Sequence, residues 1–507
     1  MGLAHASVHA GRTRRPRTRL GDVNRRGMGN HPPNLYTTKE DQTVKDSLFV
    51  SRFSHFIIRD TIFVAYHSLR MMPVYFPVSV LDVIEKIRSG VSLNELIECQ
   101  TDIEKRKEIL QAIDMLKDAK VLVEDLQEDE DAISYFRNMT GEPYPHLVYF
   151  ILTDRCNFRC RYCFLKNNSP VGYVESNMSE EVAINGLDLF CRLIGEDQEL
   201  FEEEKTIVFY GGEPLMNWKV LESLLIRIGE YQAVGKLPKK TTLNLVTNGT
   251  LLTPLIADTL KRHNVQVSIS IDGDDFVTSS NRIYENGEPV YGDIKRGFSI
   301  CREAGMDIGA SCTLSESCIT DFDGTMHVLL EECGVTNMGL NLLISNEEPY
   351  EGYNARAAEF IIKAFQIFRT HGVYEDRIMR KATAFVESRV LPFDCGASGG
   401  NQIVVAPNGD VGICHGYLME RKYFPTKVDD PSFDIKGNPD FLEWSKRSPL
   451  NMPECQKCMA LGICGGGCPF QAEIATGSMW GLDERFCTHA KMTLEWLIWD
   501  LYSQMKS

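Results

Sequence analysis

The sequence predicts an α/β protein built around an open, partial (β/α)6 TIM-like barrel. Beyond Pro145, six strand-like runs alternate with helix-like runs, which is the pattern of repeated βα units and of a parallel sheet. Because six units are too few to close a full eight-stranded barrel, the barrel is expected to be open. The length of 507 residues exceeds that of one ordinary domain, so further domains are expected before and after the barrel.

The barrel is expected to occupy residues 145–392. Its strands are predicted at 146–152, 206–210, 242–246, 265–271, 307–314 and 337–344. Helices are predicted between them at 180–193, 219–231, 255–262, 294–304 and 323–332. In such a barrel the reactive groups lie where strands end and loops begin.

A smaller unit with the element order of a winged-helix domain is expected before the barrel, at residues 45–125. Its strands are predicted at 56–58, 61–66 and 72–76, and its helices at 78–88, 93–99 and 104–119. The acidic run that starts at Glu124 predicts a linker over 126–144. Residues 1–44 are basic and lack an apolar core, which predicts a disordered tail. An organelle-targeting segment and a segment upstream of a true start at Met28 are the alternatives.

Composition and charge exclude several classes of protein. The chain is 43% hydrophobic and 24% charged, and no uninterrupted apolar run approaches the length of a membrane span, so we expect no membrane partner. The net charge of −16 argues against general nucleic-acid binding. Sixteen cysteines without a secretory signal indicate a reducing compartment, which predicts a cytoplasmic protein whose thiols bind metal.

A cysteine triplet follows the first predicted barrel strand. Cys156, Cys160 and Cys163 have C-x3-C-x2-C spacing. Three thiolates can hold three irons of a 4Fe–4S cluster and leave the fourth iron open to a small molecule. A structural zinc site is the alternative, because closely spaced cysteines also bind zinc.

Further motifs follow the next three predicted strands. They are Gly211-Gly212-Glu213-Pro214, Thr247-Asn248-Gly249-Thr250 and Ser270-Ile271-Asp272-Gly273. Motifs on successive strand ends converge in space, and a structural zinc site has no need of this context. Each motif alone is also typical of an ordinary turn.

The triplet and its aromatic neighbours resemble the cluster motif of the radical S-adenosylmethionine (SAM) enzymes. That resemblance implies that SAM chelates the open iron and is cleaved to a 5′-deoxyadenosyl radical. It also implies SAM contacts for Glu213, at the SAM amino group, and for Ser270 and Arg282, at ribose or carboxylate. Arg296 is a rival for the carboxylate. The complete set of expected SAM-binding residues is Tyr162, Gly211, Gly212, Glu213, Pro214, Asn248, Ser270 and Arg282.

A second cysteine array occupies the predicted C-terminal domain, residues 393–507. Its members are Cys395, Cys414, Cys455, Cys458, Cys464, Cys468 and Cys487. Asn408-Gly409 between two apolar runs predicts a hairpin that returns Cys414 toward Cys395. The spacing resembles the SPASM extension of radical SAM enzymes, and a pair of zinc sites is the alternative.

The SPASM resemblance divides these seven cysteines between two auxiliary 4Fe–4S clusters. Four of them are expected at an outer cluster: Cys455, Cys458, Cys464 and Cys487. The other three, Cys395, Cys414 and Cys468, are expected at an inner cluster. No eighth cysteine follows Cys395 closely, so we hypothesise an open iron for substrate, with His415 or water as the alternative. The six remaining cysteines are expected to be buried free thiols.

Three clusters and a winged-helix unit together predict a radical SAM/SPASM maturase. The N-terminal unit resembles, by element order alone, the domains that bind the leader of a ribosomal precursor peptide as an added strand. We expect a thioether or carbon–carbon cross-link in that peptide, with electrons from an external donor such as flavodoxin or ferredoxin. An anaerobic sulfatase-maturating enzyme, which forms formylglycine, and an iron–sulfur redox-sensing regulator are the alternatives.

Overall fold

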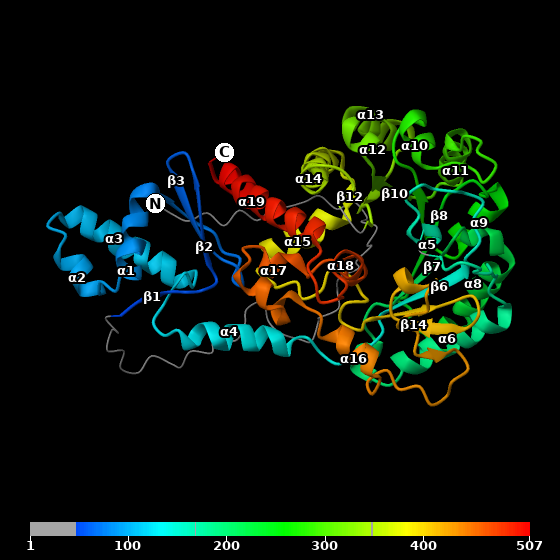
Figure 1. Ribbon diagram of the computed structural model, residues 1–507, viewed down its shortest axis with the longest axis horizontal. Helices are drawn as coiled ribbons and strands as arrows, with labels where there is room; N and C mark the ends of the chain where they lie inside the picture. The colour runs from blue at the N-terminus through cyan, green and yellow to red at the C-terminus, as the bar shows by residue number, and fades with distance from the viewer. Residues whose placement is uncertain (1–46, 168, 346–347, 507) are drawn as a thin grey trace.

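The computed structural model describes residues 47–167, 169–345 and 348–506. The tail predicted at residues 1–44 lies outside the described residues. Figure 1 shows the barrel at one end of the molecule, the N-terminal domain at the other, and the C-terminal elements between them. No described helix is both long and apolar enough to cross a membrane.

The barrel strands belong to a ten-stranded sheet in the order β12-β11-β10-β9-β8-β7-β6-β13-β14-β15. All pairs from β12 to β13 are parallel. The six central strands are β6 Leu147–Thr153, β7 Thr206–Gly211, β8 Thr242–Thr247, β9 Val265–Ser270, β10 Ile308–Leu314 and β11 Asn337–Leu342. The predicted partial barrel is therefore confirmed, with strand ends displaced by at most two residues.

Helices connect the barrel strands and cover the outer face of the sheet (Figure 1). The connecting helices are α5 Phe164–Asn167, α6 Glu180–Ile194, α7 Gln198–Phe201, η2 Pro214–Asn217, α8 Trp218–Ala233, α9 Pro254–Arg262, α10 Asp275–Asn281, α11 Tyr291–Glu303, α12 Glu316–Thr320 and α13 Phe322–His327. The helix predicted at 323–332 changes partway to a π-helix, η3 Val328–Glu332. One continuous apolar core joins these helices to the sheet.

Two strand pairings on either side of the six barrel strands were not predicted. On one side, β12 Tyr374–Glu375 pairs with β11. On the other, β13 Gln402–Val405 pairs in parallel with β6. The predicted hairpin at Asn408-Gly409 is confirmed, because β13 returns antiparallel as β14 Asp410–Gly412. The C-terminal domain thus begins inside the barrel sheet rather than beside it.

The N-terminal domain is a three-stranded antiparallel sheet with helices and its own apolar core. Its elements are β1 Phe49–Val50, β2 Ser54–Arg59, β3 Ile62–His67, β4 Val74–Pro77, η1 Val78–Val80, α1 Leu81–Arg88, α2 Leu93–Glu98, α3 Ile103–Asp118 and β5 Leu122–Val123. The predicted strands and helices are all present; the helix predicted at 78–88 begins with a 3-10 turn. A short β1–β5 pair closes the domain.

The segment predicted as an acidic linker contains a helix, α4 Gln127–Asn138. Its acidic residues lie in the first turn, where the helix dipole favours negative charge. Asp129 is buried and accepts hydrogen bonds from the Ser51 hydroxyl at 2.6 Å and from the Arg52 backbone at 2.8 Å. Residues 126–144 therefore do not form an irregular connection.

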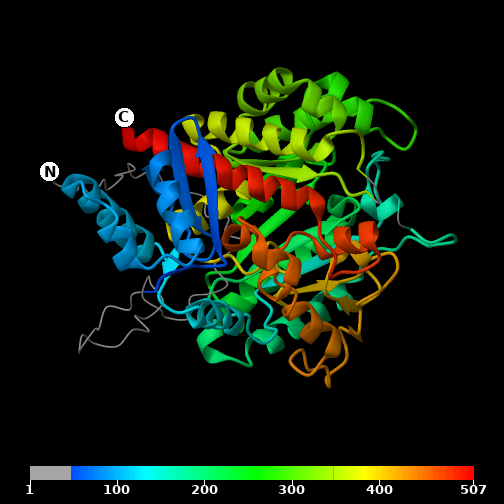
Figure 2. The ribbon, with the colours of Figure 1, turned by 60° about the vertical axis from the view of Figure 1, so that its left-hand side comes forward.

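The remaining elements bring the N-terminal domain against the C-terminal part of the chain. They are α14 Tyr353–His371, α15 Asp376–Val386, η4 His415–Tyr417, β15 Thr426–Lys427, α16 Pro439–Ser445, η5 Pro449–Asn451, η6 Pro453–Lys457, α17 Leu461–Cys464, α18 Pro469–Thr476 and α19 Glu484–Lys506. Figure 2 shows the N-terminal sheet beside α19. The Tyr75 hydroxyl donates to the Ile498 carbonyl of that helix at 2.6 Å.

Candidate metal centres and their cavity

A cavity of about 1240 Å³ lies inside the barrel and opens toward the C-terminal domain. Two of the predicted cysteine sets line it: Cys156, Cys160 and Cys163, and Cys395, Cys414 and Cys468. The pairing of β13 with β6 explains this, because it brings the start of the C-terminal domain beside the strand that precedes the first set. Cysteines more than 200 positions apart in the sequence thus share one chamber.

The first cysteine set lies on the loop between β6 and α5. An antiparallel bridge between Phe158 and Tyr284 holds this loop against the segment after α10. Burial raises the pKa of Cys156 to about 12, and the nearby Cys160 and Cys163 thiols contribute to the shift. Metal binding at this site requires thiolates, so it would release protons.

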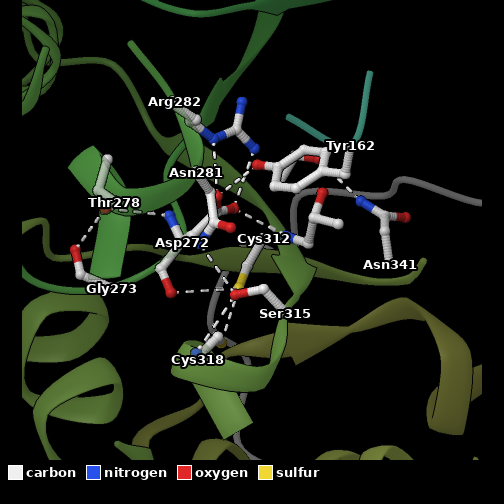
Figure 3. A network of polar contacts seen from close by, with 12 residues as sticks. Tyr162, Asp272, Gly273, Thr278, Asn281, Arg282, Cys312, Ser315, Cys318 and Asn341 are labelled. Carbon is white, nitrogen blue, oxygen red and sulfur yellow. Dashed lines mark hydrogen bonds and ion pairs between the residues drawn. The ribbon is translucent and has the colours of Figure 1, made fainter. Parts of the chain in front are cut away.

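Asp272 links the cysteine loop to the end of β9 (Figure 3). Its buried carboxylate accepts hydrogen bonds from the Nε and Nη2 of Arg282 and from the hydroxyl of Tyr162. The Arg282 guanidinium also lies 5.3 Å from the centre of the Tyr162 ring. The planar fork of Arg282, expected to face the SAM carboxylate, is therefore already paired with a carboxylate of the protein.

The glycine pair is required by a close approach between β7 and the cysteine loop. The backbone nitrogen of Gly212 donates to the carbonyl oxygen of Thr153 at 2.8 Å, and that of Glu213 donates to the carbonyl oxygen of Arg155 at 2.8 Å. A Cβ on Gly212 would lie 2.2 Å from the carbonyl oxygen of Arg155. Gly211 and Gly212 line the cavity, whereas Glu213 does not.

Glu213 is an internal anchor between β7 and β8. Its fully buried carboxylate accepts from the Thr247 hydroxyl at 2.7 Å, and from the backbone nitrogens of Asn248 at 2.7 Å and Leu215 at 3.0 Å. Burial raises its pKa to about 7, and these hydrogen bonds oppose the shift. Pro214 is also buried and starts η2. A SAM contact by Glu213 stays a prediction.

The other expected SAM-binding residues are divided between cavity and scaffold. Asn248, Ser270 and Arg282 line the cavity, as does Tyr162. The Asn248 side chain donates to the Asn157 side chain at 2.8 Å and so ties the cysteine loop to the end of β8. Arg296, the rival residue, is paired with Asp293 and does not line the cavity.

The inner set of cysteines gathers behind the β13–β14 hairpin. Burial raises the pKa of Cys414 well above its usual value, and the thiols of Cys468 and Cys395 raise it further. Because the thiols of Cys468 and Cys395 affect the pKa of Cys414, these three cysteines lie near one another. His415, beside Cys414, packs its ring 4.8 Å from Tyr149 and 5.8 Å from Phe164.

The outer set lies outside the cavity and close to the N-terminal domain. Burial raises the pKa of Cys455 to about 12, with contributions from Cys464 and Cys458. Cys464 and Cys455 likewise act on Cys487, whose pKa is raised mainly by burial. The apolar residues around this set include side chains of β3.

The three cysteine sets offer sulfur donors, which 4Fe–4S clusters and structural zinc sites both use. Among residues 47–167, 169–345 and 348–506, no three His, Cys, Asp or Glu side chains converge on a position for one metal ion. The donors in each set are thiols alone, which is the ligand type of 4Fe–4S clusters. The division of these cysteines into ligand sets for three clusters stays a prediction.

The structure also adds residues that the sequence analysis missed. Tyr149 and Tyr210 line the cavity, with ring centres 5.9 Å apart and both rings within 5.2 Å of His415. The period of two along β6 and β7 is the signal that would have placed them inside the barrel. Asp272 was part of a predicted motif but was given no role.

One expectation for the remaining cysteines is wrong. Cys191, Cys301, Cys312, Cys318 and Cys333 are buried, whereas Cys99 is exposed. Cys99 follows α2 directly, where the helix has reached the surface of the N-terminal domain.

Comparison with known proteins identifies the class to which this site belongs. Residues 150–315 match the family model of the radical SAM superfamily. That range holds the cysteine loop, the glycine pair, Asp272 and Arg282. The chain therefore contains a radical SAM domain and is a radical SAM enzyme.

Similar proteins extend the comparison beyond this domain. The radical SAM cyclopropyl synthase TigE of Paramaledivibacter caminithermalis is 26% identical over 381 residues, which are 71% of this chain and 75% of that protein. A cysteine-type anaerobic sulfatase-maturating enzyme of Clostridium perfringens is 23% identical over 329 residues, 62% of this chain and 85% of that enzyme. These relatives are SPASM-type radical SAM maturases, and the C-terminal domain of this chain fits that type.

Two solved structures share the fold. Native anSMEcpe with bound AdoMet has a TM-score of 0.58 and 18% identity, covering 71% of this chain and 98% of its own. Streptococcus suis SuiB bound to the precursor peptide SuiA has a TM-score of 0.51 and 13% identity, covering 87% of this chain and 99% of its own. At these identities the likeness concerns the fold alone.

Proposed function

We propose that this enzyme matures a ribosomally made precursor peptide, by installing a thioether or carbon–carbon cross-link with a 5′-deoxyadenosyl radical. The observation that carries the proposal is the shared cavity of the first and inner cysteine sets. A substrate carbon radical formed in this chamber must lose an electron to become an oxidised cross-link. A cluster at the inner set would be a nearby acceptor.

The residues around the cavity have separate tasks in this proposal. Cys156, Cys160 and Cys163 would hold the cluster that, with SAM, supplies the radical. Asp272 keeps Arg282 and Tyr162 in place beside that loop. The cavity-lining residues Asn248 and Ser270 would contact SAM. We further propose that electrons for SAM cleavage come from an external flavodoxin or ferredoxin.

The inner set leaves one position for a further ligand in this proposal. Cys395, Cys414 and Cys468 would hold three irons, and the fourth would bind substrate. The Nδ1 of His415 is buried and has no hydrogen-bond partner among the described residues. It is therefore the rival ligand, and its replacement by Ala tests whether the fourth position depends on the protein.

Sulfatase maturation is the second candidate function, favoured by similarity to the Clostridium perfringens enzyme. Two observations favour the peptide cross-link. TigE is named as a cyclopropyl synthase, and a cyclopropane requires a new carbon–carbon bond. The SuiB fold covers 87% of this chain, against 71% for anSMEcpe. A redox-sensing regulator has no such support.

The decisive test is anaerobic co-expression with a candidate precursor peptide, sought as a short cysteine-bearing or aromatic-bearing reading frame beside the gene. Mass spectrometry should show loss of two hydrogens in that peptide, which indicates a cross-link. Cys156→Ala should abolish both the mass change and the formation of 5′-deoxyadenosine. The exposed Cys99→Ala should leave both unchanged. Conversion of a sulfatase peptide to formylglycine, with no cross-link, would instead establish the second candidate.

We also propose that the N-terminal domain binds the leader as an added strand on β2. A two-residue turn joins Arg59 to Ile62, so these two residues form a hydrogen-bonded pair. Hydrogen-bonded and non-hydrogen-bonded pairs alternate along an antiparallel ladder. The backbone N–H and C=O groups of Phe56 and Ile58 therefore point away from β3. Ile58 is 55% exposed. An extended leader would find unpaired donors and acceptors along this edge.

The edge is tested by removing one backbone donor. Ile58→Pro removes the outward N–H without breaking the β2–β3 ladder. If the leader binds to β2, Ile58→Pro should bind the full precursor at least tenfold more weakly than the wild type does. Ile58→Ala keeps the N–H and should bind as the wild type does. Equal affinity of both variants, measured by fluorescence anisotropy with a labelled precursor, would contradict binding at this edge.

A further inference from the structure

Three arginines lie among the cysteines of the loop between β6 and α5, which we call the cysteine loop. Arg155 precedes Cys156, and Arg159 and Arg161 flank Cys160. All three arginines are exposed. In a protein with a net charge of −16, these three arginines form a local cluster of positive charge.

The loop alternates between two faces. The even-numbered residues of this stretch, Cys156, Phe158, Cys160 and Tyr162, line the cavity. The arginines occupy odd positions and do not line it. The sulfurs of the loop thus adjoin the chamber for SAM and substrate, while the guanidinium groups lie on its outer side.

The backbone fixes this arrangement. The nitrogen of Arg159 donates to the carbonyl of Ile283 at 2.8 Å, and that of Arg161 donates to the carbonyl of Asn281 at 2.9 Å. The carbonyl of Arg155 accepts from Glu213 at 2.8 Å. The loop therefore presents its charged side chains from a rigid base rather than from a mobile segment.

The three guanidinium groups are exposed and have no polar partner among the residues that the structure describes. In the described part of the chain, none of them forms an ion pair or a side-chain hydrogen bond. Glu285 lies nearby, since its nitrogen donates to Asn157 at 3.1 Å, but it too forms no ion pair among the described residues. Three unpaired cations on one loop favour an anionic partner.

We propose that Arg155, Arg159 and Arg161 form the docking surface for a small acidic electron-donor protein of the flavodoxin or ferredoxin type. The proposal rests on the proposed function, which requires an external donor. On docking, the donor loses one electron and the cluster held by Cys156, Cys160 and Cys163 gains it. No bond is made or broken.

Geometry and charge both favour this side of the loop. The cavity side is needed for SAM and substrate, so a protein donor would approach from outside, where the exposed arginines are next to the cysteines in the sequence. Opposite charges steer such an encounter and raise its rate, and salt screens the effect over about 8–10 Å. The net charge of −16 would on average repel an acidic donor, which favours docking at an unpaired basic cluster such as this one.

The test compares two double variants of equal charge change. Arg159→Glu with Arg161→Glu reverses the proposed surface. Lys239→Glu with Lys240→Glu reverses two exposed lysines before β8, at the opposite end of the barrel strands from the cysteine loop. Each change lowers the net charge equally, so a general charge effect should appear in both.

The first measurement is binding of a reduced bacterial flavodoxin to the anaerobic holoenzyme at 50 mM and 300 mM salt. We expect the arginine variant to bind about tenfold more weakly at low salt, since close charge pairs at interfaces contribute at least this much. The lysine variant should match the wild type. High salt should weaken wild-type binding and remove most of the difference.

The second measurement separates docking from catalysis. With dithionite, a small reductant that needs no docking surface, both variants should cleave SAM at the wild-type rate. With flavodoxin, only the arginine variant should be slow. The milder variant, Arg159→Gln with Arg161→Gln, gives the same comparison if charge reversal lowers the iron content.

Three outcomes would overturn the proposal. One is equal flavodoxin binding by both double variants; another is slow cleavage by the arginine variant with dithionite as well. The third is arginine-dependent binding of a single-stranded oligonucleotide without any flavodoxin binding. None of these bears on peptide maturation, whose failure would appear as a lack of cross-linked product under dithionite.

Discussion

Arg282 donates two hydrogen bonds to Asp272, at 3.0 Å from Nε and 2.9 Å from Nη2. Both side chains are almost completely shielded from solvent, with exposed fractions of 8% and 0%. The Tyr162 hydroxyl donates to the same carboxylate. A single carboxylate at the end of β9 thus fixes a residue of the cysteine loop and a residue after α10.

Removing this carboxylate should destabilise the fold. Asp272→Asn leaves the buried Arg282 without a charge partner, and breaking a buried ion pair from one side costs about 3–5 kcal/mol. We expect that loss in the free energy of unfolding of the iron-free protein, measured with denaturant. Asp293→Asn removes the partner of the half-exposed Arg296 and should cost at most about 1 kcal/mol. Equal losses would show that the Asp272 pair is not structurally important.

The sequence predicted the six barrel strands because their pattern is local. Each strand is a short apolar run followed by a turn motif, so residues adjacent in the sequence are enough to locate it. The same logic predicted the β13–β14 hairpin from Asn408-Gly409. The pairing of β13 with β6 was beyond such reasoning, because it joins segments more than 200 residues apart.

Two features of the structure could not be predicted from local sequence patterns. The acidic run after Glu124 was taken for a linker, although acidic residues stabilise the first turn of a helix and Ile133 and Phe136 provide its buried face. Glu213 was expected to face SAM from its place beside two glycines. Whether it faced the cavity or β8 depended on donors from Thr247 and Asn248, which no local motif reveals.

Iron content should report the inner set independently of activity. Cys468→Ala removes one of three ligands, so we expect about four irons fewer per chain. SAM cleavage without peptide should persist, since the first set is intact. Cys99→Ala, at an exposed cysteine, is the control and should keep the full iron content. Unchanged iron and sulfide in the Cys468 variant would exclude a cluster at that site.

Stability should depend on pH through Glu375, which is fully buried at the start of α15. Its carboxylate accepts from the nitrogens of Arg377 at 3.0 Å and Ile378 at 2.8 Å. Burial raises its pKa to about 7, from an ordinary value of 4.5. Between these values the folded state binds a proton that the unfolded state has lost. The contribution to stability is therefore complete below pH 4.5 and is lost as the pH rises to 7.

Glu375→Gln should remove this dependence. Relative to the variant, the wild-type protein should lose about 3 kcal/mol of unfolding free energy between pH 4.5 and pH 7, and nothing further above pH 7. Denaturant unfolding of both proteins at several pH values measures the difference. Asp440, which is less buried than Glu375, provides a control through Asp440→Asn, which should alter the pH profile much less. A constant difference between wild type and Glu375→Gln would contradict the expected titration.

The final prediction concerns the backbone contact between Gly212 and the cysteine loop. In Gly212→Ala the added Cβ would lie 2.2 Å from the carbonyl oxygen and 2.5 Å from the carbonyl carbon of Arg155. Neither backbone atom can move without displacing the loop, so we expect a loss of about 2–3 kcal/mol in unfolding free energy. Gly229→Ala is the matched control, because it lies in α8 with no atom within 4 Å of the new Cβ. That helical substitution should stabilise the protein by about 0.5–1 kcal/mol. If the change in unfolding free energy has opposite signs in the two variants and SAM cleavage is lost only in Gly212→Ala, this glycine is needed to position the cysteines. Similar stabilities of the two variants would instead show that the cysteine loop can move to make room for the added Cβ.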